Sequence, residues 1–184
     1  TMTVMVKGEP AERTGKSEVF LFDGGIRAFI EHLNQNKTTV HQDIIYFEKG
    51  DPNGLSLEVA MQYNDGYNEA VFSFANSINT HDGGTHLSGF RSALTRAMNA
   101  YAKKQDILKA NEEPPSGEDY REGLAAIINV KVPNPQFESQ TKVKLTNVEV
   151  EGFVASMTAE ALSTYLEEHP TAATTIVSKA VSAA

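Results

Sequence analysis

The strictest constraint on the fold is a nine-residue stretch at 55–63, in which apolar and polar side chains alternate. Five large apolar residues occupy every second position, which is typical of a strand with one face buried. An Asn-Asp-Gly turn follows at 64–66, and a second strand-like run at 69–75 places Phe72 and Phe74 on one face. This arrangement predicts a β-hairpin, so the middle of the chain is expected to form antiparallel sheet.

Helical spacing of apolar residues predicts four helices around this sheet, at about 26–33, 87–104, 150–165 and 176–181. Further strands are expected at 3–7, 17–22, 44–48 and 123–132, the first two as a hairpin. A mixed, largely antiparallel sheet with helices packed on one face is the simplest way to bury these stripes. We therefore expect an α+β fold in which residues 1–184 form a single domain.

Composition narrows the possible functions. The chain has no cysteine, which removes disulfide scaffolds, thiolate metal sites and cysteine nucleophiles. Its formal net charge of -8 opposes an extended DNA-binding surface, because acidic proteins are repelled by nucleic acid at long range, so any DNA contact must be local. There is no apolar run of membrane-spanning length and no signal-peptide pattern, so a soluble, cytoplasmic protein is expected.

The main candidate for chemistry is a short loop at 139–142, between the last predicted strand and the helix that follows it. It consists of Ser139, Gln140, Thr141 and Lys142. A lysine ammonium has three donors, and beside an amide and a hydroxyl it is suited to meet a phosphate. Taken alone, the same pattern also fits a solvated surface lysine.

Two further patterns lie at 81–86. Gly83-Gly84-Thr85 precedes a helix, where it would present backbone N–H groups to an anion or form a tight turn with Thr85 as N-cap. His81, Asp82 and His86 are metal-ligating types, but they straddle the glycine turn and lack an evident fourth ligand, so no metal site is expected. Because the motifs of common hydrolases and nucleotide-binding enzymes are missing, no self-sufficient active site is expected either.

Four stretches together resemble the transducer (second) domain of DNA gyrase B, in the type IIA DNA topoisomerase family. They are FDGGI at 22–26, NTHDGGTHLSGFR at 79–91, YREGL at 120–124 and SQTK at 139–142. They occur in the family's order and cover almost the whole chain. The B subunit of topoisomerase IV shares much of this pattern and is an alternative. A stand-alone binding or assembly module of the same fold is another, and a small metal hydrolase built on His81, Asp82 and His86 is the third.

The resemblance implies a left-handed βαβ crossover, as in the ribosomal-protein-like transducer superfamily. It also implies an ATPase domain before this chain and a metal-binding cleavage domain after it, both outside residues 1–184. The implied function is to couple ATP binding and hydrolysis in the preceding domain to clamp movement, DNA strand passage and supercoiling. The isolated chain is then expected to be inactive, with no ligand bound to it.

The resemblance also implies roles for individual residues. Lys142 would reach the γ-phosphate of ATP bound in the preceding domain, Gln140 would hydrogen-bond the same group, and Thr141 belongs to the same contact. These residues would be accessory to a water-activating carboxylate in that domain. Arg91 matches a position on the inner, DNA-facing surface of the clamp, although it also fits an ordinary surface arginine. The implied cofactors are ATP and Mg²⁺, and the implied partners are gyrase A, double-stranded DNA and a second copy of gyrase B.

Overall fold

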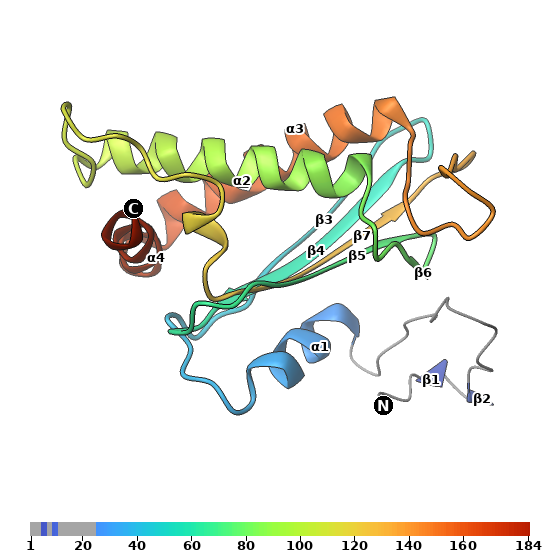
Figure 1. The fold of residues 1–184 in the computed structure, drawn as a ribbon, viewed down its shortest axis with the longest axis horizontal. Coiled ribbons are helices and arrows are strands. Elements are labelled where there is room, and N and C mark those ends of the chain that lie inside the picture. The colour runs from blue at the N-terminus through green and yellow to red at the C-terminus, as the bar shows by residue number, and fades with distance from the viewer. Residues whose placement is uncertain (1–4, 7–8, 11–24) are drawn as a thin grey trace.

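The computed structural model describes residues 5–6, 9–10 and 25–184 (Figure 1). The helices are α1 (Gly25–Asn34), α2 (Thr85–Lys104), α3 (Val148–Glu168) and α4 (Pro170–Ala183), with a 3-10 turn η1 (Asp119–Arg121). The strands are β1 (Met5–Val6), β2 (Glu9–Pro10), β3 (Ile45–Gly50), β4 (Ser56–Tyr63), β5 (Ala70–Ala75), β6 (Ile78–Asn79) and β7 (Leu124–Lys131). The four predicted helices are all confirmed. β1 pairs with β2, and the predicted strand at 17–22 lies outside the described residues.

The main sheet has five strands in the order β3-β4-β7-β5-β6. β7 lies between β4 and β5, antiparallel to the first and parallel to the second. The predicted hairpin between β4 and β5 is therefore wrong, because the turn at 64–66 spans the width of another strand. The physical reason is that β7 is apolar toward both faces of the sheet, and such a strand is most stable at the centre.

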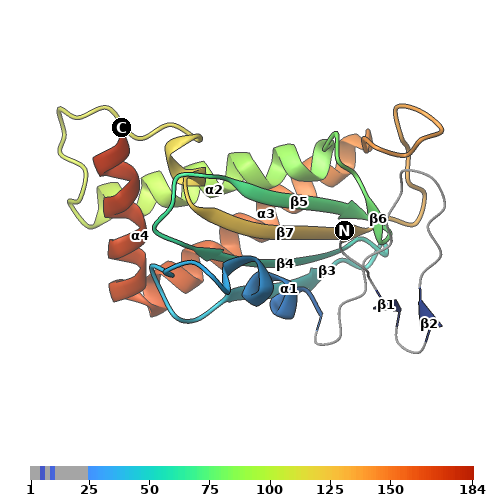
Figure 2. The ribbon, with the colours of Figure 1, turned by 60° about the horizontal axis from the view of Figure 1, so that its bottom comes forward.

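The connection from β5 to β7 crosses one face of the sheet through β6, α2 and η1. Figures 1 and 2 show α2 on the face opposite α1, with β7 next to β5. Seen from the side of α2 with the strands pointing up, β7 lies to the left of β5, so the crossover is left-handed. This handedness is rare among parallel βαβ connections. The fold class implied by the resemblance is confirmed.

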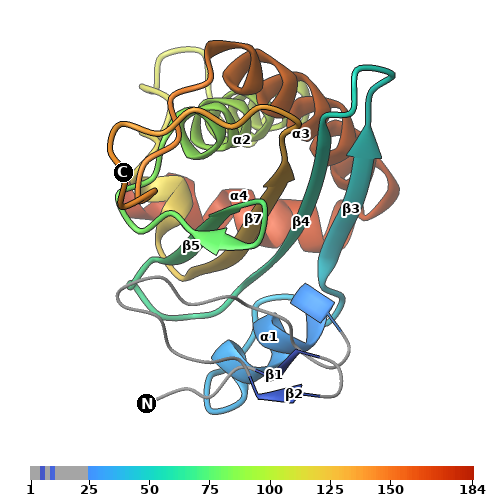
Figure 3. The ribbon, with the colours of Figure 1, turned by 90° about the vertical axis from the view of Figure 1, so that its right-hand side faces the viewer.

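The helices form unequal layers on the two faces of the sheet (Figures 1 and 3). α2, α3 and α4 cover one face, with a continuous core that includes Leu57, Met61, Phe90 and Leu94. α1 covers the opposite face with Phe29 and Ile30, which pack against Ala60, Phe74, Ala125 and Ile127. The expectation of helices on one face thus holds for three helices. α1 lies on the other because β4, β5 and β7 are also apolar there.

α2 is fixed closely against α3 and serves as the reference for the site. Gly89 makes this approach possible, because a Cβ atom there would lie 2.5 Å from the Glu151 carbonyl oxygen. Phe90, Leu94 and Met98 have no exposed surface. No helix within the described ranges is long and apolar enough to cross a membrane.

Candidate functional site

The loop that contains Lys142 is a short hairpin at 137–145, between β7 and α3. Phe137 and Leu145 form an antiparallel bridge, and the Glu138 N–H donates to the Lys144 carbonyl at 3.0 Å. At the tip, the Lys142 N–H donates to the Ser139 carbonyl at 3.1 Å, which closes a β-turn. Lys142 itself has φ 56°, the left-handed conformation that typically follows such a turn in a tight hairpin.

The side chains at the tip face solvent. The Ser139 and Thr141 hydroxyl oxygens lie 2.5 Å apart, so these two residues bond each other. Gln140 and Lys142 are exposed, and the Lys142 ammonium has no hydrogen bond or ion pair to any residue the structure describes. The tip therefore presents a free cation and an amide on a backbone that is bonded internally.

The return segment of the hairpin is joined to the start of α2. The Asp82 N–H donates to Val143 O at 3.0 Å, the Leu145 N–H to Gly83 O at 3.2 Å, and the Thr85 N–H to Leu145 O at 3.1 Å. Gly84 lies at the centre of this contact with φ 138°, and a Cβ atom there would overlap the Leu145 backbone. Only glycine fits, so the Gly-Gly turn serves close packing of the hairpin against α2.

This contact also corrects one interpretation of the Gly-Gly-Thr segment. Gly84, and not Thr85, occupies the N-cap position of α2. The Thr85 hydroxyl has no partner among the described residues, and the Thr85 N–H is used by Leu145. An N–H group in the first turn of α2 therefore already donates to a neighbouring backbone carbonyl, so fewer N–H groups remain to bind an external anion.

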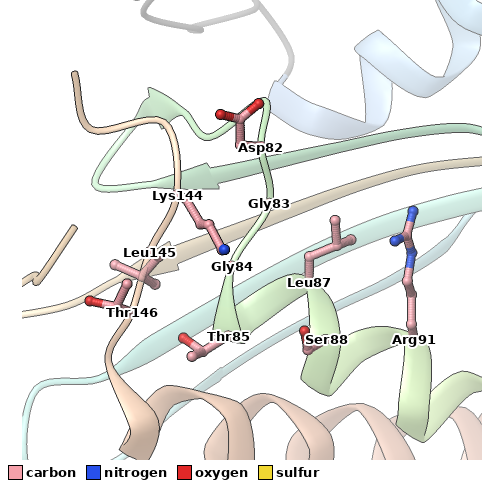
Figure 4. A pocket seen from close by; sticks show the side chains of 10 residues that line it. All are labelled: Asp82, Gly83, Gly84, Thr85, Leu87, Ser88, Arg91, Lys144, Leu145 and Thr146. Carbon is pink, nitrogen blue, oxygen red and sulfur yellow. The ribbon is translucent and has the colours of Figure 1, made fainter. Parts of the chain in front are cut away.

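A pocket of about 350 Å³ lies beside the hairpin, at the start of α2 (Figure 4). Lys144 reaches into it toward Gly84, and Arg91 lines its other end. Lys144 also forms an ion pair with Glu138 at 3.5 Å. Lys142 does not line the pocket, so the hairpin carries one lysine that faces the body of the protein and one at its exposed tip.

The two histidines near the Gly-Gly turn lie in different environments. His81 is exposed, whereas His86 is fully buried, with its Nε2 2.8 Å from the Thr80 hydroxyl. The Thr80 hydroxyl donates to Ser73 O, so in this hydrogen-bond pattern the His86 Nε2–H donates to Thr80. Burial lowers the pKa of His86 to about 4. In the part of the chain that the structure describes, no three metal-ligating side chains converge, so the proposed hydrolase site is not formed.

Arg91 lies on α2 with its side chain 41% exposed. Its Nη2 donates to Glu69 Oε1 at 2.8 Å, and Arg121 Nε donates to the other oxygen of the same carboxylate at 3.1 Å. One carboxylate thus holds two guanidinium groups, which leaves a local excess of one positive charge. Arg91 and Lys142 belong to separate parts of the surface, on α2 and on the hairpin tip.

Two residues near the hairpin were not singled out from the sequence. Lys144 is two positions from Lys142. The sequence suggested an irregular loop, whereas the structure has an extended segment there, in which side chains alternate between two sides. Asn147 precedes α3 and has the pattern of an N-cap residue. Its side chain makes no capping bond and instead contacts the hairpin's outgoing segment.

The fold belongs to a class represented by the ATPase regions of type II DNA topoisomerases. The crystal structure of the 43K ATPase domain of Thermus thermophilus gyrase B matches with a TM-score of 0.81 at 40% identity, covering 92% of this chain and 45% of that chain. The topoisomerase IV ATP binding domain of Francisella tularensis matches with a TM-score of 0.74 at 26% identity, covering 88% and 42%.

Sequence comparisons narrow the class. A family model described as DNA gyrase B matches residues 25–184. The DNA gyrase B protein of Clostridium acetobutylicum is 52% identical over 170 residues, which cover 92% of this chain and 27% of that protein. The Myxococcus xanthus gyrase B is 53% identical over 168 residues, covering 91% and 20%. The chain belongs to the DNA gyrase B family, and it spans a fifth to about a quarter of the length of these relatives.

The names of the solved relatives also refine one expectation. The motifs imply a transducer domain separate from an ATPase domain, whereas the matching solved chains are named as ATPase and ATP binding domains. This chain corresponds to less than half of each of them. This chain is therefore part of the ATPase region of a gyrase B-type protein.

Proposed function

We propose that this chain is the transducer part of that ATPase region, and that it couples ATP binding and hydrolysis in the preceding domain to movement of a DNA clamp. The observation that carries the proposal is the exposed Lys142 ammonium at the tip of a hairpin whose other side is bonded to α2. An ammonium group that is unpaired and held on a fixed backbone is suited to bind a phosphate in a neighbouring domain. The proposal also agrees with the structural match, which covers most of this chain but less than half of the gyrase ATPase domain.

In this proposal Lys142 donates to the terminal phosphate of ATP, with Gln140 and Thr141 beside it. ATP with Mg²⁺ supplies the phosphoryl group, which is held in the preceding domain. Lys142 stabilises the negative charge that develops on the phosphoryl oxygens in the transition state, where a fixed cation contributes most. It activates no water, so its role is accessory and the isolated chain is inactive.

The same contact gives a mechanical link. Lys142 is attracted to the terminal phosphate before hydrolysis and released after phosphate leaves, so nucleotide state biases the angle between two domains. Because the hairpin is hydrogen-bonded to 82–85, a displacement of its tip reaches α2 directly. α2 packs on α3 and on the sheet, so the whole helical layer follows.

The wider partners follow from the same proposal. The intact gyrase B protein would contain the ATPase domain and a C-terminal cleavage domain, act as a homodimer with gyrase A, and pass one double-stranded DNA segment through another in the cytoplasm. Arg91 is the DNA-facing candidate, since the two guanidinium groups on Glu69 exceed its charge by one. The B subunit of topoisomerase IV is the alternative, supported by the 26% identical relative of that type.

Replacing Lys142 in the intact protein tests the proposal. With Lys142→Ala, kcat for ATP hydrolysis should fall about hundredfold, the typical effect of removing one donor to a developing charge. Nucleotide affinity should fall far less, because most contacts to the nucleotide lie in the preceding domain. Steady-state hydrolysis and equilibrium nucleotide binding measure the two effects.

Two further variants control for folding and for general charge. Lys142→Asn removes the ammonium and tolerates the left-handed backbone, so it should lose as much activity as Lys142→Ala. Lys131→Ala removes an exposed lysine at the end of β7 and should leave hydrolysis unchanged. Unchanged turnover in both Lys142 variants would contradict the proposal.

A further inference from the structure

Asn147 lies between the Lys142 hairpin and α3, with only 2% of its surface exposed. Its Oδ1 accepts from the Gln136 N–H at 2.6 Å. Its Nδ2 donates to Asn134 O at 3.0 Å and to Glu149 Oε1 at 2.8 Å. The side chain therefore uses its oxygen and both of its N–H groups, and it joins the segment that leaves β7 to the segment that enters α3.

This side chain closes the base of the hairpin. The Thr146 N–H donates to Gln136 O at 2.8 Å, and the bridge between Phe137 and Leu145 follows one step further toward the tip. Asn147 thus begins the ladder that ends at Lys142. Its bond to Gln136 is short and directed at a backbone N–H, so it fixes the main chain and not merely a surface side chain.

Hydrogen bonds attach the hairpin to the rest of the protein at two places, and Leu145 and Phe137 also pack against the core. Its flank is bonded to α2 around Gly84, and its base is closed by Asn147. The side-chain bond between Ser139 and Thr141 stays within the tip itself. If the base opened, the segment that leaves β7 would lose its hydrogen-bonded support, while the return segment would stay held by the buried Leu145 and its bonds at Gly83 and Thr85.

We propose that Asn147 is a positioning residue for Lys142: it closes the base of the hairpin and so fixes where the ammonium stands relative to α2. This inference rests on the proposed function of Lys142. Asn147 touches neither nucleotide nor phosphate, and it acts only through the backbone it holds. A misplacement of about 1 Å is enough to cost up to about a hundredfold in rate at a positioned catalytic group.

The first test is a double-mutant cycle in the intact gyrase B protein. Asn147→Ala should lower kcat for ATP hydrolysis about tenfold, with little change in KM, since it displaces the ammonium without removing nucleotide contacts. In the Lys142→Ala background the same change should alter kcat by less than about twofold, because the group that Asn147 positions is gone. Asn99→Ala is the matched control: it removes bonds to Tyr120 and Pro115, away from the hairpin, and should leave kcat unchanged.

The second test reads the hairpin directly. Amide hydrogen exchange at 136–146 should become faster in Asn147→Ala and stay unchanged in Asn99→Ala. Should Asn147→Ala fold poorly, Asn147→Asp replaces it in both tests. Aspartate keeps the acceptor for the Gln136 N–H but loses the donor to Asn134 and repels Glu149. We therefore expect a lower kcat and faster exchange at 136–146 in this variant too, but with smaller changes.

The outcomes separate this inference from the proposed function. A full additional loss of kcat in the Lys142→Ala background, or unchanged exchange at 136–146, would overturn the role of Asn147 while the role of Lys142 stands. If Lys142→Ala alone leaves hydrolysis unchanged, both claims fall. Loss of the Asn147 effect in the Lys142→Ala background, with faster exchange in the hairpin, supports the proposal.

Discussion

Lys142 holds a left-handed backbone conformation, which costs a non-glycine residue roughly 1 kcal/mol or more. Glycine or asparagine would fit this position of the hairpin with less strain. The conformation is maintained by the turn bond to Ser139 and by the ladder at the hairpin base. Lysine is thus present at the tip despite the local preference of the backbone, which agrees with a role for its ammonium.

His86 sets a pH dependence of stability at the residue scale. Burial lowers its pKa to about 4 in the folded protein, from 6.5 for a free side chain. Between those values the unfolded chain binds more protons than the folded one, so the free energy of unfolding falls as pH drops. The loss should reach about 3 kcal/mol once the pH nears 4. His41 contributes in the same direction, because burial lowers its pKa as well.

Denaturant unfolding of the chain between pH 7 and pH 4.5 measures this effect. His86→Asn should be less stable at pH 7, because it removes the hydrogen bond between the buried imidazole and the Thr80 hydroxyl, but its stability should vary less with pH. His81→Asn, at an exposed position, should retain the full pH dependence of the original chain. An equal pH dependence in His86→Asn and in the original chain would contradict the assignment.

At the scale of elements, α2 and α3 pack closely at Gly89. In Gly89→Ala the new methyl group would overlap the Glu151 carbonyl, and backbone cannot move aside cheaply. We expect a loss of about 1 to 3 kcal/mol in unfolding free energy. Gly152→Ala is the matched control, since it adds a methyl to open space within α3 and should be neutral or stabilising by about 0.5 kcal/mol.

Thermal and denaturant unfolding of both variants test this packing. Equal stability of Gly89→Ala and the original chain would show that the two helices do not approach as closely as the structure has them.

The elements themselves were largely predictable from the sequence, whereas their order in the sheet was not. β4 and α2 follow from local periodicity, which each segment carries by itself. The place of β7 between β4 and β5 depends on pairing between segments about 60 positions apart, which no local pattern encodes. The run LAAIINV in β7 did carry a signal, since it is apolar at positions facing both sides and therefore favours a central strand.

At the scale of the whole molecule, the sheet separates two unequal surfaces. The hairpin, α2 and the pocket with Lys144 lie on the side of the large helical layer, and α1 lies alone on the other. The candidate loop at 139–142 could be singled out from the sequence because its residues match a family motif, and its role stays a prediction. Its attachment was not, since Gly84, Leu145 and Asn147 meet only when α2, the hairpin and α3 are assembled.

The central claim is that the Lys142 ammonium meets the terminal phosphate of ATP held in a neighbouring domain. An acyl-phosphate derivative of ATP tests it directly, because it transfers its acyl group to a lysine amine near that phosphate and leaves ATP behind. After reaction with the intact gyrase B protein, peptide mass spectrometry should find Lys142 acylated, with protection by excess ATP and no labelling of Lys131. Acylation of Lys144 or another lysine of this chain in place of Lys142, or labelling of Lys142 that excess ATP does not prevent, would contradict the claim.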